Sequence, residues 1–266
     1  MLVDTHCHLN FSQFDADRDL VIKRAQEQDV KIIINVAADM ATSKQSVDLA
    51  ASYTDIFAAV GVHPHYVNEL QGEKAIEIIR SLAKNTKVVA IGEVGLDYYR
   101  LGKTQSKACG IDESKAKQRR MLAGFMQLAA ELKLPLIFHC RDAAQDMLSV
   151  ITKEGKAGMR GVMHCFSQDK KFLRTCLDLG LYISFTANIT YKNSQNLREL
   201  AAYTPLKRLL LETDAPYLAP QTLRGKRNEP AYLKFTAQEI AGIKRIATAE
   251  ICRVTTENAY KLFSLN

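Results

Sequence analysis

The first 36 residues contain one complete strand–helix–strand pattern. The β-rich apolar run LVDTH occupies residues 2–6, RDLVIKRAQEQ follows at residues 18–28, and a second apolar run, KIIINV, occupies residues 31–36. In the middle segment, Leu20, Val21 and Ala25 recur at helical spacing, which predicts a helix between two strands. A strand, a helix and a second apolar strand in this order are typical of a parallel βα unit with a crossover helix.

The same alternation recurs along the whole chain. Most of the runs are nearly continuous in apolar residues, as expected for strands that are buried on both faces. Eight βα units in 266 residues predict a (β/α)8 TIM-type barrel, with residues 1–266 as a single domain. A doubly wound parallel sheet remains the alternative, because a count of strands does not prove closure. The eight runs are residues 2–6, 31–36, 56–62, 87–92, 134–139, 161–164, 181–185 and 208–212.

Two helix starts can be placed from residues that favour the N-cap position. Ser167 is the predicted N-cap of a helix over residues 170–179, with Gly180 just after its end. Thr248 is the predicted cap of a final helix that runs from Glu250 onward.

Composition and charge exclude several classes of protein. Hydrophobic residues make up 47% of the chain, so a sizeable core is expected and global disorder is not. Because no apolar run approaches the length of a membrane span and the N-terminus lacks a signal-peptide pattern, we expect no membrane segment. The six cysteines show no CxxC spacing, which favours the reducing cytoplasm over a disulfide scaffold. A monomer is the default expectation.

Histidines and carboxylates gather at the carboxyl ends of the predicted strands. In a barrel these ends meet at one mouth, where catalytic groups converge. The placement is shared by all six histidines and by three carboxylates: His6, His8, His63, His65, His139, His164, Asp4, Glu93 and Asp214.

The HCH motif at residues 6–8 is the sharpest local signal. Side chains two positions apart in a strand share a face, so His6 and His8 are expected to point into the barrel while Cys7 points outward. Two neutral imidazoles on one face can hold a divalent metal. The alternative is a pair of hydrogen-bonded core histidines.

Further metal-ligand candidates follow the later strands. Glu93 follows the fourth run and has two oxygens with which to bridge two ions, although a salt bridge across the mouth is the alternative. His139 and His164 end adjacent strands and form a second ligand pair, unless they are satisfied core histidines. Asp214 is the predicted ligand that accepts a proton from the nucleophilic water, and Glu212 is expected to support a ligand from behind.

This mixed set of nitrogen and oxygen ligands suits two divalent ions, Zn²⁺, Mn²⁺ or Mg²⁺, about 3.5–4 Å apart and sharing Glu93. Cys7, Cys140 and Cys165 each lie one residue from a predicted ligand, so they are expected to point away from the site. The predicted metal ligands are His6, His8, Glu93, His139, His164 and Asp214.

The net charge of +7 is concentrated in two segments that are predicted to rim this mouth. Arg100–Arg120 has seven basic and two acidic residues, and Arg224–Lys234 has four and one. Basic loops around a metal site favour a polyanionic substrate such as a phosphodiester backbone. A solvated loop is the alternative, above all for Arg100–Arg120.

Several residues near the mouth are candidates for substrate contacts. Arg141 could grip a phosphate in bidentate fashion, or instead pair with Asp142. His63 could donate a hydrogen bond to a reacting oxygen, while His65 is expected to be peripheral. Tyr98 offers a stacking face for a base, with ordinary packing as the alternative. The loop after the last strand offers four more candidates: Arg224, Lys226, Arg227 and Asn228.

These motifs, in this order, resemble the TatD family of metal-dependent deoxyribonucleases, over nearly the whole chain. The resemblance implies an amidohydrolase-related barrel that hydrolyses DNA, often as a 3′→5′ exonuclease. It also implies the same six metal ligands, with His63, Arg141 and the loop of residues 224–228 facing the substrate. Residues 101–117 look longer than the family's usual connection, which affects substrate access. The motifs are DTHCHL (4–9), GVHP (61–64), GEVGLDY (92–98), HCRD (139–142), HCF (164–166), ETDAPYLAP (212–220) and RGKRNEP (224–230).

The leading hypothesis is a deoxyribonuclease acting on single-stranded DNA or frayed ends. A metal-bound hydroxide would attack phosphorus, with Asp214, Glu93 and His63 as the catalytic residues. One alternative is a small-molecule amidohydrolase or deaminase, against which stand the basic rim and the absence of a lysine after the fourth strand. Others are a nucleic-acid-binding protein with a vestigial site, and a hydrolase of another nucleic-acid-linked ester, such as an aminoacyl ester on tRNA.

Overall fold

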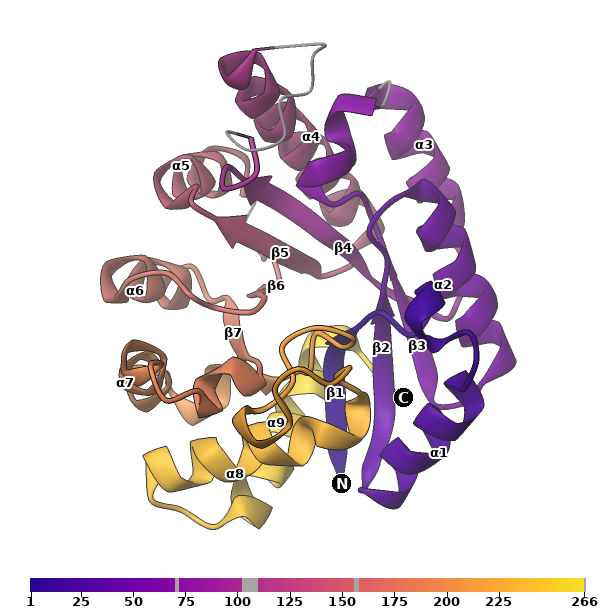
Figure 1. Ribbon diagram of the computed structural model, residues 1–266. Coiled ribbons are helices and arrows are strands. Elements are labelled where there is room, and N and C mark those ends of the chain that lie inside the picture. Colours follow the sequence, from indigo (N-terminus) through magenta and orange to yellow (C-terminus); the bar gives the residue numbers. More distant parts are fainter. Residues whose placement is uncertain (70–71, 102–109, 156–157, 266) are drawn as a thin grey trace.

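Eight parallel strands follow one another around the molecule in sequence order (Figure 1). The computed structural model describes residues 1–69, 72–101, 110–155 and 158–265. Each strand pairs with the next along the chain, as the alternating pattern predicts. The strands are β1 (Leu2–Cys7), β2 (Val30–Val36), β3 (Ile56–Val60), β4 (Val88–Asp97), β5 (Leu136–Arg141), β6 (Gly161–Met163), β7 (Tyr182–Phe185) and β8 (Leu209–Leu211).

The first strand also meets the segment that follows the last one. Cys7 forms a parallel bridge with Ala215, and the backbone N–H of Asp214 donates to the carbonyl of His6 at 2.8 Å. The sheet is therefore a nearly closed barrel, and the doubly wound alternative is excluded.

Asp4 reinforces this seam from inside the protein. Its fully buried carboxylate accepts hydrogen bonds from the Thr213 backbone N–H at 2.9 Å and from the Thr213 hydroxyl at 2.5 Å. Burial raises the pKa of Asp4 to about 7, against the lowering effect of these bonds. Asp4 thus joins the two ends of the barrel wall and is not one of the converging ligands.

The helices lie outside the ring of strands (Figure 1). Within the described residues no helix is long and apolar enough to cross a membrane. The helices are α1 (Arg18–Glu27), α2 (Met40–Ser52), α3 (Gly72–Leu82), α4 (Ile111–Leu132), α5 (Ala144–Glu154), α6 (Lys170–Asp178), α7 (Gln195–Tyr203), α8 (Leu233–Lys244) and α9 (Thr248–Phe263).

Two apolar clusters stabilise the barrel. The larger one fills the space between strands and helices, while the smaller one joins inward-facing strand residues such as Ile34, Ile137 and Leu210. Phe263 of α9 belongs to the smaller cluster, because this helix packs on β1 and β8. The barrel is therefore filled by side chains, and its chemistry is confined to the end where the polar residues gather.

Some element boundaries differ from the predictions. β4 continues to Asp97, five residues beyond the predicted end, and pairs with β5 along that extension. The cap of α6 is Asp169, whose carboxylate accepts the Phe172 N–H at 2.7 Å, so the assignment of Ser167 was wrong. Thr248 is the first residue of α9, not its cap. Of the segment predicted to be unusually long, residues 102–109 lie outside the described residues.

Candidate metal centre

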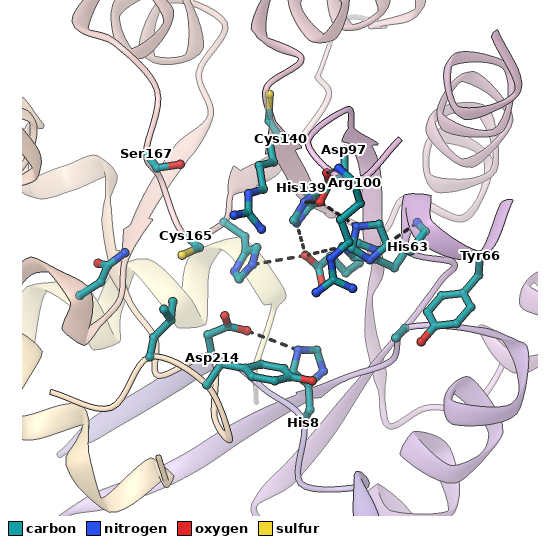
Figure 2. Close-up of a pocket in the computed structure, with 18 of the residues that line it drawn as sticks. His8, His63, Tyr66, Asp97, Arg100, His139, Cys140, Cys165, Ser167 and Asp214 are labelled. Carbon is teal, nitrogen blue, oxygen red and sulfur yellow. Dashed lines mark hydrogen bonds and ion pairs between the residues drawn. The ribbon is translucent and has the colours of Figure 1, made fainter. Parts of the chain in front are cut away.

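A pocket of about 470 Å³ opens where the polar side chains gather (Figure 2). It is lined by five of the six predicted metal ligands, and the sixth, His6, is completely buried beside them. Figure 2 draws the side chains of several strands around this common space. The predicted ligands that line the pocket are His8, Glu93, His139, His164 and Asp214.

One half of the centre comes from the ends of β1 and β8 and the residues just after them, with Glu93 of β4. The Nε2 atoms of His6 and His8 lie 3.3 Å apart, as the shared strand face predicts. Glu93 Oε2 lies 3.5 Å from His6 Nε2, and Asp214 Oδ1 lies 3.4 Å from His8 Nε2. Two imidazoles and two carboxylates thus converge on one volume.

The other half comes from β5 and β6. Glu93 Oε1 lies 2.6 Å from His139 Nδ1 and 3.3 Å from His164 Nε2. The two oxygens of this carboxylate therefore face different histidine pairs. That is the arrangement a carboxylate needs in order to bridge two metal ions.

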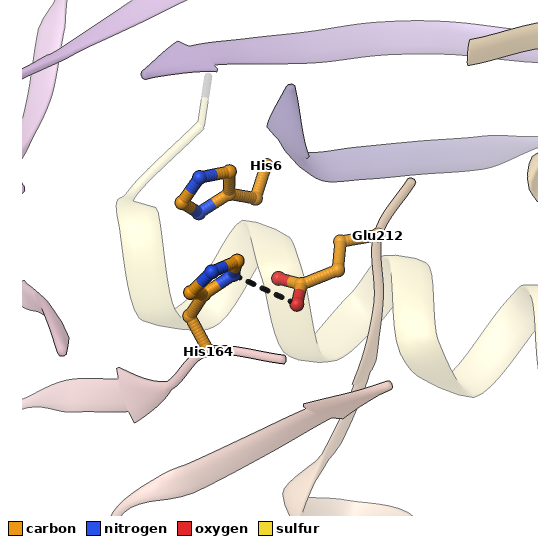
Figure 3. Close-up of side chains that lie close together, drawn as sticks. All are labelled: His6, His164 and Glu212. Carbon is orange, nitrogen blue, oxygen red and sulfur yellow. Dashed lines mark hydrogen bonds and ion pairs between the residues drawn. The ribbon is translucent and has the colours of Figure 1, made fainter. Parts of the chain in front are cut away.

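The outward nitrogens of two imidazoles are fixed by acceptors. His8 Nδ1 donates to the carbonyl of Val36 at 2.8 Å, and His164 Nδ1 donates to Glu212 Oε1 at 2.9 Å (Figure 3). In a neutral imidazole this leaves the lone pair on Nε2, which faces the centre in both residues. The donor set therefore fits divalent metal ions, and Glu212 lies behind His164, on the side away from the centre.

Asp97 is a buried member of the site that the sequence reasoning missed. Its Oδ2 lies 3.2 Å from His139 Nε2 and 2.8 Å from His65 Nε2. His65 was expected to be peripheral, yet it lines the pocket and holds this carboxylate. Asp97 follows Glu93 by an even number of residues on the extended β4, and this was the available signal.

His63 is placed to donate a hydrogen bond into the pocket. Its Nδ1 accepts the backbone N–H of His65 at 3.1 Å, so in a neutral ring the proton lies on Nε2. That Nε2 is 3.9 Å from Glu93 Oε1. Burial, together with the neighbouring His139, holds the pKa of His63 well below its usual value, which keeps the ring neutral.

The two central carboxylates stay ionised in spite of their burial. Desolvation alone would raise the pKa of Glu93, but the neighbouring His164 and His139, the latter also through its hydrogen bond, hold it well below the usual value. Desolvation likewise opposes ionisation of Asp214, but the histidines beside it, above all His8, lower the pKa of that carboxyl. Both groups therefore carry the charge that a cation requires.

Cys165 departs from its predicted orientation. Cys7 and Cys140 pack into the apolar core, but Cys165 Sγ lies within ligand reach of His164 and Asp214. The alternation rule fails here because β6 ends at Met163. Burial raises the pKa of Cys165 to about 12, so this group is a neutral thiol.

Arg141, a candidate for substrate contact, lines the pocket. Its guanidinium lies 3.8 Å above the ring of Tyr99. Arg100, at the start of the predicted basic segment, lines the same pocket. Tyr98 does not line it, because its hydroxyl donates to Asp146 at 2.7 Å on the side of α5.

The four candidates in the loop after β8 do not line the pocket. Arg227 donates to Asp17 at 2.8 and 2.7 Å, and Asn228 is fully buried. The guanidinium of Arg224 lies 4.6 Å from the ring centre of Tyr191, and Lys226 is exposed. These contacts give Arg227 and Asn228 a structural role.

A parallel (β/α)8 barrel with two groups of convergent ligands at one end defines a class of metal-dependent hydrolases. The family model described as "TatD related DNase" matches residues 3–264. The chain belongs to this TatD family of metal-dependent hydrolases.

Individual relatives agree with this assignment. The chain is 39% identical over 267 residues to the uncharacterized metal-dependent hydrolase YabD of Bacillus subtilis, covering 100% of both chains. It is 36% identical over 271 residues to the 3′-5′ ssDNA/RNA exonuclease TatD of Erwinia tasmaniensis, covering 99% of this chain and 100% of that one. The crystal structure of the TatD homologue YjjV from Escherichia coli superimposes with a TM-score of 0.89 at 28% identity, covering 100% of this chain and 98% of the other.

Proposed function

We propose that this protein is a metal-dependent nuclease that cleaves DNA phosphodiester bonds, removing nucleotides from the 3′ ends of single-stranded or frayed DNA. The observation that carries the proposal is the position of Glu93 between two histidine pairs. Its two oxygens face His6 on one side and His139 and His164 on the other.

The residues divide into two ligand groups around this carboxylate. His6, His8 and Asp214 would hold one divalent ion, and His139 and His164 would hold a second, with Glu93 shared. Zn²⁺, Mn²⁺ and Mg²⁺ are the candidates. Divalent ions bound there supply an activated water and offset the charge on phosphoryl oxygens.

The chain's own groups then complete the chemistry. Asp214, with Oδ1 held 3.4 Å from His8 Nε2, orients the attacking water and accepts its proton. The neutral His63 donates from Nε2 to an oxygen on which charge develops. Arg141 and Arg100, both at the pocket, bind phosphate groups of the substrate backbone.

The relatives support this choice of substrate in part. The TatD protein of Erwinia tasmaniensis is named a 3′-5′ ssDNA/RNA exonuclease, whereas YabD is named only as a metal-dependent hydrolase. The two arginines at the pocket favour a phosphate-bearing substrate over a neutral cyclic amide or nucleobase.

The test is degradation of single-stranded oligonucleotides labelled at either the 5′ or the 3′ end, after metal removal and re-addition of Mg²⁺, Mn²⁺ or Zn²⁺. We expect metal-dependent shortening from the 3′ end and its loss in Asp214→Ala. Asp15→Ala is the matched control, because that exposed carboxylate pairs with Arg18 and should leave the activity unchanged. Cleavage that is independent of metal, or an Asp214→Ala variant with full activity, would overturn the proposal.

A further inference from the structure

Exposed aromatic side chains gather around the pocket. Among the described residues, seven large hydrophobic side chains are exposed, and three of them are tyrosines near this mouth. Tyr66 and Tyr217, which are 37% and 48% exposed, line the pocket, and Tyr99 lies under Arg141. Because burying an aromatic ring is strongly favourable, rings left open beside a catalytic pocket are candidates for ligand contacts.

Tyr217 is held in place by its backbone. Its N–H donates to the carbonyl of Asp214 at 2.9 Å, and its carbonyl accepts from Asn228 Nδ2 at 2.6 Å. The same Asn228 amide also donates to the carbonyl of Thr213 at 2.9 Å. The buried Asn228 therefore fixes the turn that presents both the Asp214 carboxylate and the Tyr217 ring.

The ring of Tyr217 forms one side of an aromatic corner. Phe11 stacks on His8, with ring centres 4.5 Å apart and planes 10° apart. Tyr217 stands across this stack, 6.5 Å from Phe11 with planes at 75°. A flat ring that lies against Tyr217 would meet the neighbouring aromatic ring edge to face, a favoured geometry for aromatic pairs.

Cations line the same pocket as this corner. Arg100 and Arg141 contribute guanidinium groups to its lining. Tyr217 is three residues after Asp214, so its ring lies close to the proposed reaction centre. Figure 2 draws Tyr66, Arg100 and Asp214 around one space. The pocket thus offers an aromatic surface beside groups that can bind phosphate. These two features match the flat base and the phosphate of a nucleotide.

We propose that Tyr217, with Phe11 beside it, forms a subsite that stacks the base of the nucleotide whose phosphate is attacked. The inference rests on the proposed nuclease function and names the part of the substrate that this side of the pocket recognises. Stacking tolerates any base, because every base has a π-face. The subsite would therefore distinguish a nucleotide from a simple phosphodiester without selecting a sequence.

The test compares two substrates with the same leaving group. Thymidine 5′-p-nitrophenyl phosphate carries a base, and methyl p-nitrophenyl phosphate does not. We expect the wild-type protein to favour the thymidine ester in kcat/KM. Tyr217→Leu should reduce that preference about tenfold, whereas Tyr217→Phe should keep it. Tyr203→Leu is the control, since this tyrosine is 41% exposed but lies outside the pocket lining.

An unchanged preference in Tyr217→Leu, or an equal loss on both esters, would overturn the subsite. If the wild-type protein hydrolyses neither ester and does not shorten the labelled oligonucleotides, the proposed function fails instead. The inference is then tested by calorimetry, which compares the affinity of the protein for thymidine 5′-monophosphate with its affinity for deoxyribose 5-phosphate. Tighter binding of the nucleotide that is lost in Tyr217→Leu would support the subsite, and equal binding of the two ligands would refute it.

Discussion

The floor of the pocket and the segment from Arg224 to Glu229 both concentrate charged or ligand-type side chains, but they arrange them differently. In the segment, the charged side chains of Arg227 and Glu229 each have a partner of opposite charge. Arg227 pairs with Asp17 at 2.7 Å, and Arg24 of α1 pairs with Glu229 at 2.7 Å. These matched pairs join the loop after β8 to α1.

On the floor the outer atoms are paired, whereas the inner atoms converge. His8 and His164 donate outward to Val36 and Glu212, and their other nitrogens face the ionised Glu93 and Asp214. Matched pairs of opposite charge stabilise a fold. Converging imidazole lone pairs and carboxylate oxygens instead leave atoms that can bind a metal ion. The comparison separates candidate binding residues from structural ones even where composition alone does not.

The substitution that tests this distinction most strongly is Glu93→Gln. Removing the shared charge should lower kcat/KM by about 10³-fold or more, because metal ions contribute several kcal/mol of charge stabilisation. Metal content by elemental analysis should fall in parallel, with the circular dichroism spectrum unchanged. Glu229→Gln is the matched control, and it should lower thermal stability while leaving kcat/KM unchanged. Equal loss of activity in the two variants would contradict the distinction.

A second prediction concerns the outward partner of His164. Glu212→Gln weakens the acceptor for Nδ1–H, and the affinity for metal should fall about 10–100-fold. Competition with a chromophoric chelator at neutral pH measures this affinity. An unchanged affinity would show that the ring is oriented without Glu212.

Two of the arginines that the sequence predicts to contact the substrate, Arg141 and Arg227, provide a smaller contrast. Arg141→Ala should raise KM about tenfold, since one charge-assisted hydrogen bond to phosphate is lost. Arg227→Ala should leave KM unchanged and lower the free energy of unfolding by about 1 kcal/mol or less, because its pair with Asp17 is partly exposed. Steady-state kinetics and urea unfolding of both variants test this, and a raised KM in Arg227→Ala would return that residue to the substrate-binding set.

The smallest expected effect is a dependence of stability on pH. Hydrogen bonds from Arg227 lower the pKa of Asp17 to about 2, below its ordinary value of 3.8. A carboxyl with a lowered folded-state pKa stabilises the fold above its unfolded pKa, and this contribution disappears as pH falls toward 2. The stability difference between wild type and Asp17→Asn, less than about 1 kcal/mol by urea unfolding, should therefore shrink between pH 5 and pH 2. A difference that stays constant over this range would contradict the assignment.

Much of the fold was predictable, because strands buried on both faces leave continuous apolar runs. The lower half of β4 was predicted in this way, but its extension to Asp97 was not, since VGLD interrupts the apolar run with glycine and acid. The prediction of the α6 N-cap was wrong because Ser167 and Asp169 are both favourable N-cap residues.

The site was predictable wherever the side chains belong to strand ends that the sequence places correctly, which excludes Asp97. His6 and His8 could be placed from their spacing of two residues, and His164 from its position directly after a strand, since strand ends meet in a barrel. The role of Arg227 could not be predicted, because its partner Asp17 lies 210 residues away in the sequence. From the sequence alone such an arginine is a candidate for substrate binding, and only the structure shows its ion pair with Asp17.

The seam of the barrel also determines when the centre can exist during synthesis of the chain. Asp4 and Thr213 are 209 positions apart, and the proposed ligands beside them, His6 and Asp214, meet only when that seam forms. A nascent chain on the ribosome therefore exposes His6 and His8 long before their carboxylate partner has been made. Contacts of such long sequence separation form late in folding, so this half of the centre cannot bind its ion as a local motif. The barrel must therefore close before this half of the centre can bind a metal ion.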